Sequence, residues 1–225
     1  MIELSKEAAS ARIAKNIAAL VDEWAEESFV LNLGVGIPTQ VSNYITNKNI
    51  FIQAENGMLG VGPIAEGDQI HPNLINAGRQ PVLETPGCVF FDSSTSFGMI
   101  RGGYVDATVL GAFEVDQPAN VANWIIPGGK QLGVGGAMDL VAGANTVIIA
   151  MTHTNKGKAK LIKECTLPIT GHKRVHWIVT ECAVIHFEEG RAVLKKIAPE
   201  ISVEDVISMT EFPLVVDENL ETMIP

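Results

Sequence analysis

Cysteine, positive charge and long apolar runs are all scarce in this sequence, and each scarcity excludes a class of protein. There are three cysteines, Cys88, Cys165 and Cys182, and no pair of them has the spacing of metal ligands. Such a set is typical of reduced thiols in a cytoplasmic protein rather than of a disulfide framework. Lysine and arginine number 16 against 26 aspartate and glutamate, a net charge of −10, which argues against a nucleic-acid partner.

No stretch of the chain is long and apolar enough to cross a membrane, and the first residues lack the apolar core of a signal peptide. His172 and His176 are four residues apart, but no HExxH pattern surrounds them, so we expect no metal site. With 225 residues, 47% of them hydrophobic and 19% charged, the chain is globular and can bury a substantial core. We expect a single domain over residues 1–225.

Strand and helix patterns alternate along the first two thirds of the chain. Apolar periodicity predicts helices at 8–24, 36–45 and 93–100, and buried strands at 28–34, 49–55, 87–92, 105–115 and 145–152. Residues 62–78 read as irregular. The last third predicts strands at 175–181, 183–190 and 191–197, followed by a capped segment at 202–210. These patterns predict an α/β fold, an open and mostly parallel sheet with flanking helices and an antiparallel C-terminal portion.

A lone carboxylate stands out in the segment QAENGMLGVG, residues 53–62. Glu55 ends an apolar run and is followed at once by Asn-Gly and two further glycines. In open α/β sheets, binding sites form beyond the carboxyl ends of the strands, and both Glu55 and the Gly34–Gly36 loop fall at such ends. Three interpretations compete, namely a turn residue, an acid that binds a ribose, and a covalent nucleophile.

The ribose-binding interpretation depends on the Gly34-Val35-Gly36 loop. This Gly-x-Gly follows a predicted strand, and Glu55 comes 55 − 34 = 21 residues after Gly34, close to the spacing of a dinucleotide site. However, Thr39 occupies the position where that fingerprint needs its third glycine. The turn interpretation requires only that Asn56 or Gly57 adopt a positive φ.

The nucleophile interpretation explains why glycines cluster at several strand ends. A carboxylate can attack an acyl group when oxyanion donors lie nearby, and glycines let a ligand approach backbone N–H groups closely. The sequence has no GxSxG motif and no recognisable Cys/His pair that would supply a different nucleophile. A lone glutamate among glycines fits this chemistry.

The segment AENGMLGVGP resembles the glutamate signature of the 3-oxoacid CoA-transferases. The similarity continues, in order and spacing, over about residues 10–210, through LGVGIPT, NLINAG, FFDSSTSFGMIRGGYVD, ANWIIPG, GGAMDLV and KECTLPITG. The sequence is therefore similar to the B (β) subunit of acetate/acetoacetate-type CoA-transferases. The resemblance implies a CoA-transferase-like fold of the NagB/RpiA type, which agrees with the α/β pattern.

The resemblance also implies roles for individual residues. Glu55 matches the nucleophilic glutamate, and Gly136 matches a glycine whose backbone N–H forms part of the oxyanion hole. The positions that match the CoA-binding segments are Gly34, Val35, Gly36, Asn56 and Gly57, the first three of which are candidates for a second oxyanion donor. Arg101 also matches, and its role is open between a structural ion pair, a helix C-cap and a substrate contact.

The implied reaction moves CoA between a short-chain acyl-CoA, such as acetyl-CoA or butyryl-CoA, and a carboxylic acid such as acetoacetate. It is ping-pong and passes through a glutamyl-CoA thioester on Glu55. CoA enters as a substrate, and no tightly bound cofactor is expected. The partner would be a separate A (α) subunit in a cytoplasmic heterotetramer. Two alternatives stay open: transfer to another acid such as 3-oxoadipate, and a non-catalytic ligand-sensing domain of the same fold, which would not need Glu55.

Overall fold

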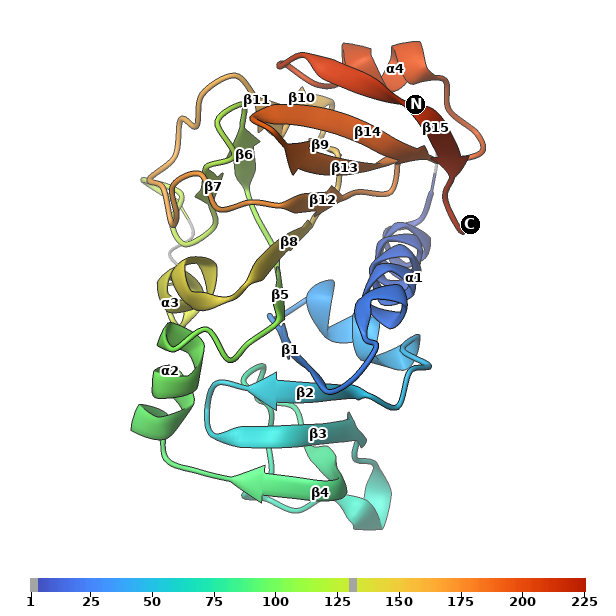
Figure 1. Cartoon of the computed structure of the whole chain (residues 1–225). Helices are drawn as coiled ribbons and strands as arrows, with labels where there is room; N and C mark the ends of the chain where they lie inside the picture. Colours follow the sequence, from blue (N-terminus) through green and yellow to red (C-terminus); the bar gives the residue numbers. More distant parts are fainter. Residues whose placement is uncertain (1–3, 130–132) are drawn as a thin grey trace.

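In the part of the chain described by this computed structural model, residues 4–129 and 133–225, ten strands form the main sheet. Their order is β15-β14-β13-β12-β8-β5-β1-β2-β3-β4, seen nearly edge-on in Figure 1. The five central strands run parallel. They are β12 (Trp177–Val179), β8 (Thr146–Ala150), β5 (Ala107–Leu110), β1 (Phe29–Leu33) and β2 (Ile50–Ala54).

Antiparallel strands extend the sheet on both sides of this parallel centre. On one side β2 pairs with β3 (Met58–Ile64), and β3 pairs with β4 (Val82–Phe90). On the other side β12 is followed by β13 (Ala183–Glu188) and β14 (Arg191–Ile197). The outermost strand, β15 (Leu214–Thr222), runs parallel to β14.

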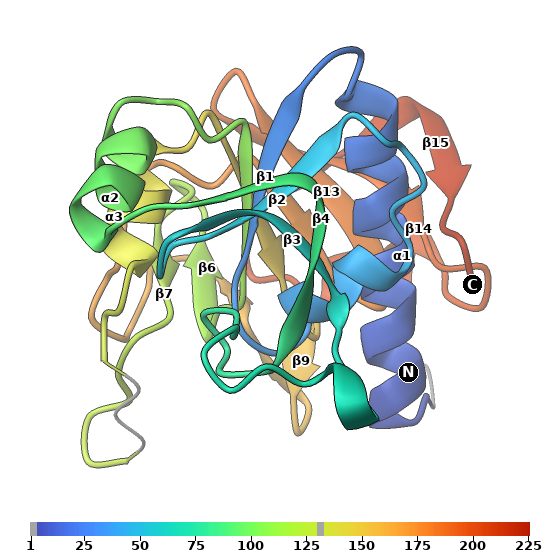
Figure 2. The ribbon, with the colours of Figure 1, turned by 90° about the horizontal axis from the view of Figure 1, so that it is seen from below.

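The helices cover both faces of the sheet (Figures 1 and 2). One face carries α1 (Lys6–Trp24) and the other carries α2 (Ser93–Arg101), α3 (Ala137–Gly143) and α4 (Val203–Ser208). The remaining elements are the 3-10 helices η1 (Pro38–Asn43) and η2 (Gly67–Gln69), a small sheet of β6 (Glu114–Asp116), β7 (Val121–Ala122) and β11 (Leu161–Ile162), and a hairpin of β9 (Thr154–Asn155) and β10 (Lys158–Ala159). Among the described residues, no helix has the length and apolar character that crossing a membrane requires.

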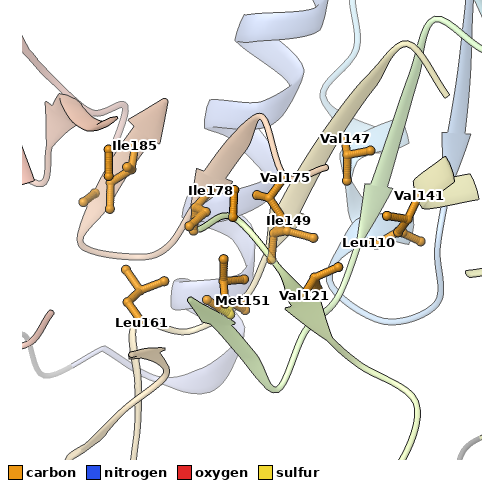
Figure 3. Close-up of a cluster of buried hydrophobic side chains, with 14 of the residues drawn as sticks. Leu110, Val121, Val141, Val147, Ile149, Met151, Leu161, Val175, Ile178 and Ile185 are labelled. Atoms are coloured by element: carbon orange, nitrogen blue, oxygen red, sulfur yellow. The ribbon is translucent and has the colours of Figure 1, made fainter. Parts of the chain in front are cut away.

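The protein has two hydrophobic cores, one on each face of the sheet, because successive side chains of the central strands point to opposite faces. In β8, Val147 and Ile149 face the α2–α3 side, whereas Ile148 and Ala150 face α1. Successive side chains of a strand point to opposite faces, so a strand covered on both faces must be apolar throughout. Figure 3 shows Val147 and Ile149 in the first of these clusters, together with Val141 of α3.

The predicted fold class is confirmed, including the parallel centre, the flanking helices and the antiparallel C-terminal portion. The cap predicted for the segment at 202–210 is confirmed as well, and α2 also begins with a side-chain cap. The Asp92 side chain accepts a hydrogen bond from the backbone N–H of Thr95 at the start of α2. Ser202 and Asp205 form a reciprocal capping box at α4, which satisfies backbone N–H groups that a helix start leaves unpaired.

The predicted helix at 36–45 is wrong in type, because the segment forms the short 3-10 helix η1. The Thr39 hydroxyl donates to the Gly34 carbonyl at 3.0 Å, and the Ser42 hydroxyl donates to the Thr39 carbonyl at 2.9 Å. Such side-chain bonds compete with α-helical bonding. The predicted strand at 105–115 also divides, because β5 ends at Leu110 and β6 starts at Glu114 in a different sheet.

The strand pair β3–β4 was not fully predicted, because the sequence of β3 has the composition of a loop. Gly60 and Gly62 are required by the neighbouring strand. A Cβ on Gly60 would lie 2.9 Å from Thr85 Oγ1, and one on Gly62 would lie 2.8 Å from the Leu83 carbonyl oxygen. Glycine in a strand often marks such a close approach. Residues 62–78, predicted to be irregular, therefore begin within β3.

A buried histidine gives the fold a pH dependence. His153 is fully buried; its Nε2 lies 3.0 Å from the Thr210 hydroxyl and its Nδ1 lies 3.0 Å from the Thr180 hydroxyl. Burial, with a smaller contribution from the charge of Lys160, lowers the pKa of His153 from 6.5 to about 4. The unfolded chain therefore binds a proton between these pH values that the folded chain does not, and stability falls as pH falls through this window.

We predict that His153 contributes about 3 kcal/mol to the loss of unfolding free energy between pH 6.5 and pH 4. Urea denaturation at a series of pH values should show a shallower pH dependence for His153→Gln than for the unsubstituted protein. His172→Gln is the matched control, because His172 is exposed. An unchanged slope in His153→Gln would contradict the assignment.

Candidate active site

Glu55 occupies a three-residue turn between β2 and β3. Ala54 pairs with Met58 across the hairpin, and the Gly57 N–H donates to the Ala54 carbonyl at 3.0 Å. Gly57 has φ 122°, and a Cβ on it would collide with the carbonyl oxygen of Phe91. A three-residue hairpin loop whose last residue has a positive φ favours glycine at that position. The turn interpretation is therefore correct for Gly57, and it leaves the Glu55 side chain available for another role.

Asn56 acts within the fold at this turn. Its side-chain amide donates to the Ile75 carbonyl at 2.8 Å, which ties the turn to the loop between η2 and β4. The same loop brings Gly78 close to the glycine loop, since a Cβ on Gly78 would lie 3.7 Å from Val35 Cγ2. Asn56 and Gly57 thus shape the surroundings of Glu55.

A network of buried polar side chains from β1, β2, β5 and α2 supports the Glu55 carboxylate. Asn32 Nδ2 lies 3.2 Å from Glu55 Oε2 and 2.7 Å from Gln53 Oε1. Gln53 Nε2 donates to the Ser96 hydroxyl at 2.9 Å, and the Thr108 hydroxyl donates to Asn32 Oδ1 at 3.2 Å. The four residues that support Glu55 in this chain of contacts are each at most 1% exposed. Buried polar groups without a partner are costly, so such a network fixes one arrangement.

Gly136 packs directly against the Glu55 side chain. A Cβ on Gly136 would lie 3.3 Å from Glu55 Cγ and 3.3 Å from Phe97 Cζ. Gly136 has φ −88° and precedes α3, so its backbone does not require glycine, but a larger residue would press against Glu55 and Phe97. The structure therefore brings together the two residues predicted as catalytic, although they are far apart in the sequence. In Figures 1 and 2 the β2–β3 turn points toward the side of the sheet that carries α2 and α3.

The glycine loop follows β1 at the same edge of the sheet. Strands β1 and β2 pair in register at Asn32 and Gln53, so Gly34 and Glu55 follow neighbouring strand ends. The Gly34 N–H already donates to the Val109 carbonyl at 2.9 Å, and a Cβ there would lie 3.0 Å from that oxygen. Gly34 is therefore excluded as a second oxyanion donor. Val35, 68% exposed, and Gly36, with φ 94°, remain candidates.

Arg101 forms an ion pair in this structure. Its Nε donates to Asp139 Oδ1 at 2.7 Å, and its guanidinium lies over the Phe97 ring, 5.7 Å from the centroid. The helix C-cap is Gly102 rather than Arg101. Arg101 therefore joins α2 to α3 beside Gly136, and no contact with Glu55 is seen for it.

Two surface hollows in the described part of the chain bear on how the site is enclosed. A groove of about 370 Å³ is lined by the glycine loop, η1 and the Gly78 loop. A larger cleft of about 680 Å³ lies between the β9–β10 hairpin and α4, on a different part of the surface. Glu55 lines neither, so these hollows do not enclose the carboxylate.

The dinucleotide interpretation is not supported by this geometry. Only the six-residue 3-10 helix η1 follows the glycine loop, whereas a dinucleotide site places the pyrophosphate at the start of an α-helix. Thr39, at the third glycine position, uses its hydroxyl to bind the Gly34 carbonyl. Glu55 leads into the antiparallel strand β3.

Sequence reasoning missed the network below Glu55. Asn32, Gln53 and Thr108 each interrupt an apolar strand with a polar side chain, and Ser96 lies in the first turns of α2. A polar residue within a predicted buried strand is a usable signal, because it must find a partner. Which residues become neighbours depends on strand register, which the sequence pattern alone does not supply.

Comparison with known proteins gives a consistent result. The model of the coenzyme A transferase family matches residues 14–209. The chain is 50% identical over 196 residues to the beta subunit of acetate CoA-transferase of Haemophilus influenzae, covering 86% of this chain and 87% of that protein. It is 43% identical over 192 residues to the B subunit of a probable succinyl-CoA:3-ketoacid coenzyme A transferase of Bacillus subtilis, covering 84% and 89%.

Solved structures share the fold at low sequence identity. The thioester complex of the acyl-CoA transferase YdiF of Escherichia coli O157:H7 with CoA matches with a TM-score of 0.73 at 21% identity. The match covers 99% of this chain but only 44% of the YdiF chain. A single-residue variant of the decarboxylase AibA/AibB matches with a TM-score of 0.68 at 18% identity, covering 94% of this chain and 89% of that one. A fold shared by a transferase and a decarboxylase does not decide the reaction.

We predict that Gly136→Ala changes the free energy of unfolding by no more than about 1 kcal/mol, because φ −88° suits alanine and the clash is slight. The Glu55 side chain, however, should be displaced from Asn32 in a crystal structure of the variant. The matched control is Gly98→Ala in α2. A Cβ at this position meets nothing within 4 Å, so the substitution should stabilise the helix and leave Glu55 in place. A Glu55 side chain that is unmoved in Gly136→Ala would show that the packing is not restrictive.

Proposed function

The chain belongs to the coenzyme A transferase family, and we propose that it is the B (β) subunit of an enzyme that transfers CoA between a short-chain acyl-CoA and a carboxylic acid. Acetyl-CoA or butyryl-CoA would be the donor, and an acid such as acetoacetate the acceptor. One observation carries the proposal. Glu55 is held by a hydrogen bond from Asn32 and packs against the backbone of Gly136, as a nucleophile beside an oxyanion donor must be.

The proposed reaction proceeds by four exchanges at one carboxylate. Glu55 attacks the acyl-CoA carbonyl carbon, and the tetrahedral intermediate collapses to an acyl-glutamyl anhydride and CoA thiolate. The thiolate attacks the Glu55 carbonyl carbon, which forms the glutamyl-CoA thioester and releases the first acid as its carboxylate. The second acid reverses both steps. One thioester replaces another, so no external energy source is needed.

The backbone of Gly136 is the proposed donor to the oxyanion of the acyl group. Glycine at this position lets the thioester approach the N–H without a Cβ in the way. Removal of one such donor typically costs roughly 3–4 kcal/mol of transition-state stabilisation. The second donor is proposed to be the N–H of Val35 or Gly36, since the Gly34 N–H is bound to Val109.

The acid pair is proposed to be short monocarboxylates. The Haemophilus relative is named for acetate and the Bacillus relative for succinyl-CoA and a 3-ketoacid, so similarity alone supports either. The sequence motifs around Glu55 carry no additional run of basic residues that a second carboxylate would favour. This favours acetate, butyrate and acetoacetate over dicarboxylates.

A separate A (α) subunit is the proposed partner, in a heterotetramer with the active site between the two kinds of subunit. Two observations support this. The relatives are named as beta or B subunits, and this chain spans only 44% of the YdiF chain. The three unpaired cysteines suit the proposed cytoplasmic location.

We predict that the chain purified alone is folded but nearly inactive, and that activity appears when it is co-expressed with an A-type subunit from the same genome. The assay is CoA exchange from acetyl-CoA and butyryl-CoA to a panel containing acetoacetate, succinate and 3-oxoadipate. Monocarboxylates should be preferred. Glu55→Gln should abolish exchange, whereas Glu27→Gln, at an exposed site, should not. Full activity in Glu55→Gln would refute the proposed nucleophile, and strong activity of the lone chain would refute the need for a partner.

A further inference from the structure

The network below Glu55 has a fixed polarity. The Gln53 carbonyl can only accept a hydrogen bond, and it lies 3.2 Å from Asn32 Nδ2. The NH₂ group of Asn32 must therefore face Gln53 and Glu55, and its Oδ1 faces the Thr108 hydroxyl. The opposite orientation of the amide would place Oδ1 against a carbonyl and a carboxylate. The two N–H groups of Asn32 thus serve three acceptors, the Gln53 carbonyl, Gln53 Oε1 and Glu55 Oε2, and Asn32 presents N–H rather than oxygen to Glu55.

This arrangement distinguishes the two oxygens of the nucleophile. Asn32 binds Oε2, which leaves Oε1 as the atom that attacks the acyl-CoA carbonyl and becomes the bridging oxygen of the anhydride. Oε2 then becomes the carbonyl oxygen of the acylated glutamate. It is this oxygen that receives the electron pair when the thiolate attacks the Glu55 carbonyl carbon.

We propose, resting on the function proposed above, that Asn32 is a catalytic residue that donates to the oxyanion formed on Glu55 itself. The thiolate sulfur forms a bond to the Glu55 carbonyl carbon, and the C=O pair moves to Oε2, beside Asn32 Nδ2. Collapse of this intermediate breaks the bond to Oε1, and the first acid leaves as its carboxylate. The same donor serves when the second acid attacks the thioester. The donor of Gly136 belongs to the other oxyanion, on the substrate acyl group.

Burial makes this donor effective. Asn32 is fully buried, so water does not replace it, and preorganised donors in such surroundings stabilise developing charge more than donors in water do. Gln53, Ser96 and Thr108 act as positioning residues. Gln53 Oε1 accepts from Asn32 only because Gln53 Nε2 is directed at the Ser96 hydroxyl, and Thr108 occupies the acceptor side of the Asn32 amide.

The experiment uses the enzyme assembled with its A-type partner. Single-turnover mixing with acetyl-CoA gives the rate constant of glutamyl-CoA formation, and mixing the loaded enzyme with acetoacetate gives the rate constant of its consumption. Asn32→Leu, similar in size but without the donor, should lower both rate constants about 100-fold. Thr108→Val should lower both to a smaller extent, about fivefold, because the amide loses one of the bonds that orient it.

A pH profile separates this role from a structural one. In Asn32→Asp the new carboxylate would face Glu55 and the Gln53 carbonyl, and it could donate to Glu55 only when protonated. The rates of this variant should therefore recover toward acidic pH, in contrast to those of the unsubstituted enzyme. The matched control is Asn16→Leu, which removes a buried asparagine that bonds to Arg12 and Ile224 in the fold, away from the site. It should lose stability and keep both rate constants.

The outcomes distinguish failure of the proposed function from failure of the role assigned to Asn32. If the unsubstituted enzyme forms no glutamyl-CoA, the proposed function fails. If it does, and Asn32→Leu reacts within threefold of its rates, the assignment of Asn32 alone is overturned. If Asn32→Leu does not fold, the other two variants decide. Rates of Thr108→Val equal to those of the unsubstituted enzyme, with no acidic recovery in Asn32→Asp, would equally overturn it.

Discussion

The backbone of Gly57 lies against the carbonyl of Phe91, and the position of the site depends on this contact. The Phe91 N–H donates to the Gly57 carbonyl at 3.0 Å, and no side chain fits at Gly57. Phe91 immediately precedes Asp92, the cap of α2. The turn that carries Glu55 is thereby fixed to the start of α2, and an ion pair joins α2 to α3. Through these links the carboxylate reaches the backbone of Gly136.

The site has two parts, a set of backbone glycines and a network of buried side-chain amides. In the proposed function the backbone glycines leave space for a thioester, and the Asn32 network holds the carboxylate from inside the sheet. Neither feature is required by the fold, which is shared with a decarboxylase. In our proposal the chemistry is set by the Glu55 side chain at the β2–β3 turn and by the hydrogen-bond donors around it. The net charge of −10 does not oppose this, because local donors outweigh a diffuse surface charge at short range.

Sequence pattern predicted those elements whose residues carry their own signal. The strands at 28–34, 49–55 and 145–152 are predominantly apolar segments, and the helix at 202–210 has its capping box. The pattern failed at β3, where Gly60 and Gly62 are selected by the closeness of β4, and at β15, whose pairing with β14 is a tertiary contact. The proximity of Glu55 to Gly136 was available only through family resemblance, since no local spacing encodes a contact between a hairpin turn and the start of α3.

The central claim is that Glu55 becomes covalently attached to CoA, and chemical trapping tests it most directly. The assembled enzyme is incubated with acyl-CoA alone, treated with borohydride and digested, and the peptide containing residues 53–62 is weighed by mass spectrometry. The account predicts loss of activity and a glutamate reduced to the alcohol at Glu55, and neither change without acyl-CoA. Retained activity with an unmodified Glu55, or reduction at a different residue, would contradict it.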